Sequence, residues 1–245
     1  MMKRILILTD NEELLKRFKD LIRVKSLDNN PNYSFDYAFS FNNKVFIEKF
    51  REVDWIRPLK VKDEIDFLSS KYSMIISLHC KQIFPAALIN NVKCINVHPG
   101  LNPYNRGWFP HVFSILNSYP CGATIHEMDE QLDHGPIICQ KEVDVEMWDT
   151  SLTLYNKILD AEMYLLEQNI EKILSGDYKT VIKGEGNVNL KKDFDDLCKI
   201  DLDNVDTFRN HINRLRALTH RDYKNAYFID DSGDKIYLKL ELRKE

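Results

Sequence analysis

Cysteine is scarce in this sequence of 245 residues, which holds only 5 of them. They are widely spaced and odd in number, and no two form a C-x-x-C pair. We therefore expect neither a disulfide framework nor a zinc ribbon. We interpret the cysteines as reduced thiols of a cytoplasmic protein, most of them in the core. They are Cys80, Cys94, Cys121, Cys139 and Cys198.

Long apolar runs are also missing. The run near the N-terminus, Ile5 to Leu8, ends at Thr9-Asp10-Asn11. It is too short for a signal peptide or for a membrane span, which needs roughly 20 apolar residues. No other window of the sequence is long and apolar enough. We therefore expect a cytoplasmic protein that does not bind a membrane.

The sequence has no excess of positive charge, because 34 Lys and Arg face 38 Asp and Glu, for a formal net charge of −4. The basic residues are scattered, so we do not expect a nucleic-acid partner. No G-x-G-x-x-G fingerprint follows the first apolar run, which argues against a dinucleotide-phosphate loop. His79 and Cys80 are adjacent but lack further residues at metal-ligand spacing, so no metal site is expected.

Short apolar runs alternate with segments of helical periodicity over the first part of the chain. KRILIL at 3–8 predicts a buried strand, and the helical pattern at 9–22 has Asp10 or Asn11 as its N-cap. A strand, a turn and a helix in that order begin a mostly parallel α/β sheet flanked by helices. Further strands are expected at 32–41, 74–80 and 93–98, and helices at 85–91, 110–118 and 151–176.

The pattern changes after residue 178, so we expect domains at 1–178 and 179–245. Residues 183–204 are polar and poor in regular pattern, a helix is expected at 206–218, and 226–242 predicts a β-hairpin. An isolated hairpin is marginally stable in water, so its apolar face must be covered by the main domain or by a second subunit. This face contains Ile236, Leu238, Leu240 and Leu242.

The stretch INVHPGLNPYNRGWFP at 95–110 concentrates polar, aromatic and turn-forming residues directly after an apolar run. Asn96 and His98 point to the same side of a strand, because strand side chains alternate. Ligands of open α/β sheets bind beyond the carboxyl ends of the strands, where both residues lie. The prolines and glycines then end the strand and stiffen the loop that carries Arg106 and Trp108.

A second turn, LDHGP at 132–136, supplies the carboxylate of Asp133. An amide donor, an imidazole and a carboxylate are what acyl transfer to an amine requires. The amide can stabilise an oxyanion, the imidazole can take a proton, and the carboxylate keeps the imidazole basic and oriented. A serine or cysteine nucleophile is unnecessary if the acceptor amine attacks directly.

Two motifs resemble a known family. NVHPGLNPYNRG at 96–107 and MDEQLDHGPII at 128–138 are similar to the two signatures of the 10-formyltetrahydrofolate-dependent formyltransferases. The longer NPYNRGWFPHVFSILN at 102–117 looks most like the bacterial sugar N-formyltransferases that act on dTDP-linked amino sugars. A weaker resemblance, RLRALTHRDYKNAYF at 214–228, is to the carboxyl-terminal module of the tRNA and sugar enzymes. The motif match covers roughly residues 74–140, and it implies a Rossmann-like formyltransferase core.

This resemblance implies that Asn96, His98 and Asp133 are the catalytic residues, with 10-formyltetrahydrofolate as the one-carbon donor and no metal. It implies an acceptor that is a dTDP-linked amino-dideoxyhexose, with dTDP-4-amino-4,6-dideoxyglucose favoured, and a product used in surface polysaccharide (O-antigen) synthesis. The expected folate contacts are Ser77, His79, Lys81, Ile83, Phe84, Met128 and Asp129. The expected sugar-nucleotide contacts are Arg106, Trp108, Lys81 and Tyr223. A homodimer joined through the hairpin is also expected.

Several alternatives stay open at this stage. The amine can be on carbon 3 of the hexose, or the acceptor can be another amine such as glycinamide ribonucleotide or a charged tRNA. A non-enzymatic binding module that recruits a partner through the hairpin is a third class. His126 is interpreted as structural. His134 departs from the small or hydroxyl residue often found beside the family's aspartate, and we expect it in solvent.

Overall fold

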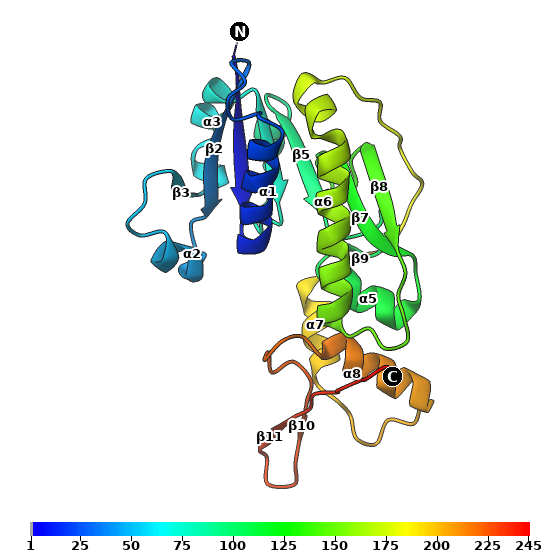
Figure 1. Ribbon diagram of the computed structural model, residues 1–245. Coiled ribbons are helices and arrows are strands. Elements are labelled where there is room, and N and C mark those ends of the chain that lie inside the picture. Colours follow the sequence, from blue (N-terminus) through cyan, green and yellow to red (C-terminus); the bar gives the residue numbers. More distant parts are fainter. Residues whose placement is uncertain (1) are drawn as a thin grey trace. The chain divides into compact units, whose positions relative to one another are not determined.

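The computed structural model describes residues 2–245, and a seven-stranded sheet is its main feature (Figure 1). The strand order is β3-β2-β1-β4-β5-β7-β8. The pairs from β3 through β5 are parallel, whereas β7 runs antiparallel to β5. The mostly parallel sheet predicted from the sequence is confirmed. The strands are β1 (Lys3–Thr9), β2 (Tyr33–Ser40), β3 (Ile56–Leu59), β4 (Met74–Leu78), β5 (Lys93–His98), β7 (Cys121–Glu127) and β8 (Ile137–Val143).

The chain divides into two compact units, and each contains segments from different parts of the sequence. The first unit comprises the chain up to residue 98 together with 124–140 and 162–182. The second comprises 99–123, 141–161 and 183–245. No helix within residues 2–245 combines the length and apolarity needed to cross a bilayer.

Strand β1 and helix α1 (Glu12–Val24) form as the sequence predicts. The side chain of Asn11 caps the helix by accepting a hydrogen bond from the backbone N–H of Leu14. Glu12 and Glu13 then place negative charge in the first turn, where it interacts favourably with the helix dipole. The helix buries one apolar face, made of Leu14, Leu15, Phe18 and Ile22.

One face of the sheet carries an apolar cluster that helices α3 (Ile65–Lys71) and α4 (Ala86–Ile89) cover through Leu68 and Leu88. Leu6 of β1, Ile75 of β4 and Cys94 of β5 are members of this cluster. Since side chains alternate along a strand, Asn96 and His98 project from the same face as Cys94. The cluster therefore supports the strand whose carboxyl end holds the candidate catalytic residues.

Several elements were not expected from the sequence. These are strand β3, helix α2 (Lys44–Lys49), helix α3 and a short 3₁₀ turn at Val61–Asp63. Strand β3 contains Pro58, which lacks a backbone N–H, and it lies at the edge of the sheet, where such a residue is tolerated. Strand β3 extends the parallel sheet beyond β2.

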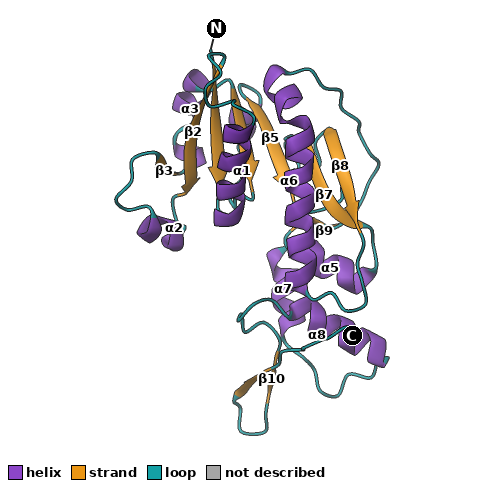
Figure 2. Ribbon diagram, in the orientation of Figure 1, coloured by secondary structure: helices purple, strands orange, loops and turns teal. Residues whose placement is uncertain are grey.

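Helix α5 (Pro110–Asn117) begins at a proline, as expected for a first-turn position. The longest helix, α6 (Ser151–Ser175), also matches its predicted extent. It ends at Gly176, whose φ of +87° is a left-handed conformation that glycine adopts without steric cost. Figure 2 shows the irregular chain that follows α6.

The C-terminal region contains one helix more than the sequence pattern suggested. Helix α7 (Lys191–Cys198) lies within the polar segment expected to be irregular, and helix α8 (Phe208–Leu218) follows. Strands β10 (Tyr227–Ile229) and β11 (Lys235–Tyr237) form the predicted antiparallel hairpin, and β9 (Val188–Asn189) pairs with β6 (Arg106–Gly107).

The apolar face of the hairpin is partly covered by its own module. Leu238 packs against a cluster that includes Cys198, Leu218 and Ala226. Its backbone N–H donates to the carbonyl of Ala226 at 2.9 Å. In contrast, Ile236 remains 39% exposed. The module therefore covers the base of the hairpin and leaves Ile236, in the middle of β11, accessible.

All five cysteines are free thiols. Burial is the main cause that raises the pKa of Cys80 and of Cys94 to about 12. Burial likewise raises the pKa of Cys121 and of Cys139 to about 11. At neutral pH these thiols are protonated and poorly nucleophilic.

Candidate active site

The carboxyl end of β5 is paired with a neighbouring strand on each side, β4 and β7. Ser77 of the parallel strand β4 is the register partner of Asn96, and His126 of the antiparallel strand β7 faces Asn96 from the other side. His98 is paired in register with Thr124. The backbone of β5 is thus held along both edges, which fixes where the Asn96 and His98 side chains project.

The loop between β7 and β8, residues 128–136, supplies Asp133. The backbone N–H of Glu127 donates to the carbonyl of Pro136 at 2.9 Å and closes the loop. A Cβ at Gly135 would lie 1.9 Å from the carbonyl oxygen of Glu127, so only glycine fits there. Asp133 itself has a φ of +47°, a left-handed conformation that is uncommon outside glycine and is often found at functional sites.

The structure brings the three predicted catalytic side chains together. Asn96 Nδ2 donates to Asp133 Oδ1 at 2.9 Å, and His98 Nδ1 lies 3.4 Å from Asp133 Oδ2. The side chains of His98 and Asp133 are 3% and 12% exposed. The 3.4 Å separation is long for a hydrogen bond, as is common in catalytic sites before a substrate binds. One carboxylate therefore orients both the amide and the imidazole.

His126 is also part of this constellation, which the sequence interpretation did not anticipate. Its Nδ1 lies 2.7 Å from the carbonyl oxygen of Glu127, which can only accept, so Nδ1 carries the proton. Nε2 is then an acceptor, 3.3 Å from Asn96 Nδ2, and it lies 3.8 Å from Asp133 Oδ1. His126 thus fixes which end of the Asn96 amide faces Asp133.

Burial lowers the pKa of His126, and the charge of Asp133 offsets only part of this effect. Asp129 also favours the protonated ring, whereas His134 opposes it. The folded protein therefore keeps His126 neutral at pH values where the unfolded chain binds a proton, below about 6.5. Stability from this residue is present above that pH and is lost as the pH falls.

We expect the free energy of unfolding to decrease below pH 6.5 more steeply in the wild type than in His126→Gln. The difference in slope should approach about 1.4 kcal/mol per pH unit, the value for one proton. Urea unfolding of both proteins between pH 5 and pH 8 measures it. Parallel curves for the two proteins would contradict a neutral buried His126.

The turn after β4 contains most of the predicted folate contacts. The carboxylate of Asp10 accepts a hydrogen bond from the backbone N–H of Lys81 at 3.0 Å. The side chain of Gln82 donates to the carbonyl of Leu59 at 2.9 Å and accepts from the backbone N–H of Val61 at 3.0 Å. These contacts anchor the turn to the ends of β1 and β3.

The predicted folate contacts on this segment differ in exposure. Ser77 and Phe84 are buried, and Phe84 packs in the apolar cluster beneath α4. Ile83, in contrast, is 83% exposed. Lys81 is exposed and His79 is partly buried. The turn therefore presents Lys81 and Ile83 outward and uses Ser77 and Phe84 to fix its position.

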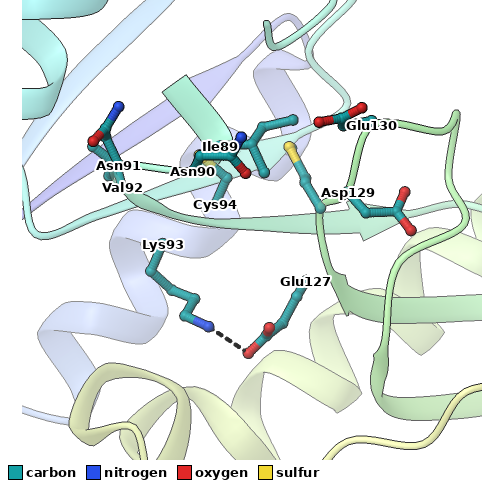
Figure 3. A pocket seen from close by; sticks show the side chains of 10 residues that line it. Ile89, Asn90, Asn91, Val92, Lys93, Cys94, Glu127, Asp129 and Glu130 are labelled. Atoms are coloured by element: carbon teal, nitrogen blue, oxygen red, sulfur yellow. Dashed lines mark hydrogen bonds and ion pairs between the residues drawn. The ribbon is translucent and has the colours of Figure 1, made fainter. Parts of the chain in front are cut away.

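A cavity of about 390 Å³ lies beside the first residues of β5 and the start of the 128–136 loop (Figure 3). Met128 and Asp129, both predicted to contact folate, line it. Lys93 pairs with Glu127 at 2.8 Å, and Tyr178 donates to the same Glu127 carboxylate at 2.7 Å. The remaining lining residues are Ile89, Asn90, Asn91, Val92, Cys94 and Glu130.

The lining of this cavity combines the apolar side chains of Ile89, Val92 and Met128 with the carboxylates of Glu127, Asp129 and Glu130. The cavity shares β5 with Asn96 and His98, and it shares the 128–136 loop with Asp133. No cluster of three or more His, Cys, Asp or Glu side chains suited to a metal ion occurs among residues 2–245.

His134 is not simply a solvated side chain, as the sequence suggested. Its Nδ1 lies 2.7 Å from Asp129 Oδ2, and each of the two side chains is 34% exposed. This pair stabilises the middle of the 128–136 loop. The imidazole therefore helps to orient Asp129, which lines the cavity.

In the second unit, Asn105 organises the loop that follows His98 in the chain. Asn105 is buried, and its Oδ1 accepts hydrogen bonds from Asn117, Asn187 and Asn189 at 2.7, 2.8 and 3.2 Å. Its Nδ2 donates to Ser114 Oγ at 3.0 Å. A buried amide with its partners satisfied in this way defines one loop conformation.

The predicted sugar-nucleotide contacts on this unit are held by backbone pairing. Arg106 lies on β6, and the N–H of Trp108 donates to the carbonyl of Asn189 at 2.8 Å. Tyr223 is 66% exposed, and its ring lies 5.9 Å from the ring of His220. The backbone beside β9 thus fixes Arg106 and Trp108, whereas Tyr223 belongs to the segment after α8.

The mostly parallel sheet brings together an amide, an imidazole and a carboxylate, which are the groups that acyl transfer to an amine requires. The Formyl transferase family model matches residues 38–170, and the model for the N-formyltransferase dimerization C-terminal domain matches residues 193–244. The chain belongs to the formyl transferase family. The resemblance inferred from the motifs is confirmed, and the chain is a formyltransferase.

Individual relatives agree with this assignment. The chain is 50% identical over 186 residues to the dTDP-4-amino-4,6-dideoxyglucose formyltransferase of Mycobacterium tuberculosis, an alignment that covers 76% of this chain and 80% of the relative. It superposes with a TM-score of 0.94 and 44% identity on a 4-N formyltransferase from Francisella tularensis, covering 100% of this chain and 99% of the other. A sugar N-formyltransferase from a Shewanella species gives a TM-score of 0.94 and 41% identity, with 100% of both chains covered.

Proposed function

We propose that the chain transfers the formyl group of 10-formyltetrahydrofolate to the amine of dTDP-4-amino-4,6-dideoxyglucose. The observation that carries this proposal is the junction of Asn96, His98 and Asp133 in a chain that is 50% identical to an enzyme named for that sugar nucleotide. The reaction forms a carbon–nitrogen bond to the sugar and breaks the one to N10 of the folate. The proton lost by the amine balances the one gained by N10.

Each member of the constellation has a distinct task in this reaction. Asn96 keeps one N–H on Asp133 and turns the other, which faces His126 at a long 3.3 Å, to the oxyanion that forms when the amine adds to the formyl carbon, an interaction worth about 3 kcal/mol in the barrier. His98 accepts the proton from the attacking nitrogen and delivers it to the leaving one. Asp133 stabilises the imidazolium that exists between these two transfers and keeps the ring oriented.

The folate supplies an activated formyl group, and the cavity beside β5 is suited to its ring system. Met128 and Asp129 line that cavity at the amino end of β5, and the turn after β4 lies beside the carboxyl end of the same strand, where Leu78 pairs with Val97. We assign the donor to this region, in contact with the loop and the turn. The proposed contacts are Ser77, His79, Lys81, Ile83, Phe84, Met128 and Asp129.

The acceptor carries a diphosphate and a thymine, which call for cations and an aromatic surface. Arg106 and Lys81 supply the cations, and Trp108 and Tyr223 supply the rings. Arg106 and Trp108 follow His98 in the chain on the loop that Asn105 organises. The hydrogen bonds of Asn105 hold this loop in one conformation, which supports a role for the loop in positioning the sugar nucleotide.

The catalytic domain corresponds to residues 1–178 in this proposal, and 179–245 form a C-terminal module that joins two copies of the chain. A match to a dimerization domain over residues 193–244 supports the association, and the exposed side chain of Ile236 on the hairpin supports the surface used. The product would be formed in the cytoplasm and used in a surface polysaccharide, the O-antigen. Sedimentation at micromolar concentration tests the dimer, and a monomer there would refute it.

The test of the sugar is a comparison of specificity constants. The purified chain is supplied with 10-formyltetrahydrofolate and each of four acceptors, the 4-amino and 3-amino dTDP-dideoxyhexoses of gluco and galacto configuration. The 4-amino gluco sugar should have the highest kcat/KM, because a misplaced amine loses its alignment with His98. A preference for a 3-amino sugar would overturn the assigned position, and transfer to none of the four would overturn the substrate class.

A further inference from the structure

A carboxylate is buried in helix α6 outside the constellation described above. Glu162 is 0% exposed, its Oε1 lies 2.7 Å from Nε2 of His79, and its Oε2 is buried without a hydrogen-bond partner among residues 2–245. Burial raises the pKa of Glu162, and only His79 and Arg17 offset this effect. A buried acid so sparsely paired destabilises a fold, so its presence calls for another explanation.

The partner of this carboxylate is held from its other side as well. Asn11 uses its Oδ1 to accept the N–H of Leu14, so its Nδ2 is the group that faces His79, 3.3 Å from Nδ1. An amide nitrogen can only donate, so Nδ1 of His79 accepts and the ring proton is on Nε2. That proton points at Glu162. The imidazole is thereby fixed in one tautomer and one orientation.

His79 begins the turn that contains most of the proposed folate contacts. Its φ of +57° is a left-handed conformation, which is strained for a residue with a Cβ. Two residues later Asp10 holds the backbone N–H of Lys81. The contacts of the His79 ring with Asn11 and Glu162 fix the start of the turn, and the hydrogen bond from the Lys81 N–H to Asp10 fixes its middle. Together they determine the path of the chain from β4 to Pro85.

We propose that Glu162 is a positioning residue for folate binding, which acts by holding His79 so that the turn at residues 79–84 keeps its binding conformation. The inference rests on the proposed function, because it assumes that this turn contacts the folate. The inference gives helix α6 a role in folate binding, although this helix lies outside both sequence motifs.

The first experiment measures binding of 5-formyltetrahydrofolate, a non-reacting analogue, by calorimetry. Glu162→Leu removes the acceptor and should weaken binding by about 10-fold or more, which is 1.4 kcal/mol or more. Glu162→Gln keeps an acceptor oxygen and should stay within about 3-fold of the wild type. The matched control is Glu167→Gln on the exposed side of the same helix, which should bind like the wild type. Equal affinity of the wild type and Glu162→Leu, or an equal loss in both Glu162 variants, would overturn the proposal.

A double-mutant cycle tests whether Glu162 acts through His79. In the His79→Ala background, Glu162→Leu should cause no further loss of folate affinity, because the ring it holds is gone. The KM for the sugar nucleotide should change less than about 2-fold in Glu162→Leu, whereas general destabilisation would raise it too. An additive loss in the double variant would overturn the inference. Absence of folate binding by the wild-type chain would instead refute the proposed function.

Discussion

Replacing His98 by alanine is expected to lower kcat by about 10²- to 10⁴-fold, the contribution of a well-placed acid–base group. No other side chain in the described site can take the proton from the attacking amine at the same position. His126 is a neutral acceptor directed at Asn96, and its pKa is lowered by burial, so it is a poor substitute. Formyl transfer to the preferred sugar, followed by steady-state kinetics, measures the effect.

The control for this experiment is His211→Ala on helix α8, which should retain full activity. Circular dichroism and thermal unfolding establish that His98→Ala remains folded. Binding of 5-formyltetrahydrofolate should change little, because in the proposed mechanism His98 acts on the reacting atoms. A folded His98→Ala protein with unchanged turnover would exclude His98 from the mechanism.

Asp133→Asn is expected to lower kcat by about 10²-fold or more, although the substitution preserves the shape of the side chain. The two carboxylate oxygens contact the Asn96 amide and the His98 ring, and both contacts need an acceptor. An asparagine has only one acceptor oxygen, so its NH₂ must face either the amide donor or the imidazole. It also removes the negative charge that stabilises an imidazolium.

The kinetic pattern distinguishes this effect from a loss of binding. We expect kcat to fall while the KM values for both substrates change little, since in the proposed mechanism Asp133 acts mainly in the transition state. Asp177→Asn, an exposed aspartate after α6, serves as the control for loss of one negative charge. A rise in KM at unchanged kcat would show that Asp133 binds substrate instead.

Much of the fold could be predicted from local patterns in the sequence. Strand β1, the Asn11 cap and helix α6 were predictable because each is defined by a few neighbouring residues. Strand β3 was not, because Arg57 and Pro58 interrupt its apolar pattern and only its place at the edge of the sheet makes it a strand. Helix α7 was hidden by its charged composition, since it buries little besides Cys198.

The candidate site also combines residues that local motifs predict with residues that only the packing of the fold brings together. Asn96, His98 and Asp133 were predictable because each belongs to a short motif at the end of a strand. His126 reaches the site only through the antiparallel register that sets it opposite Asn96, a relation across 30 residues. Glu162 contacts His79 from 83 residues away. No local pattern contains such contacts, because they depend on how the strands and helices pack.

Strand β5 sets the distance between the cavity near its first residues and the imidazole of His98 at its carboxyl end. Cys94 lines the cavity, and four positions later His98 carries the imidazole, a separation of about 13 Å at 3.3 Å per residue. In the proposed function this separation sets the reach of the donor, because a folate whose ring lies in the cavity must extend its formyl carbon along that length to His98. Inserting one residue between Cys94 and Asn96 would turn the imidazole to the opposite side of the sheet and break this match.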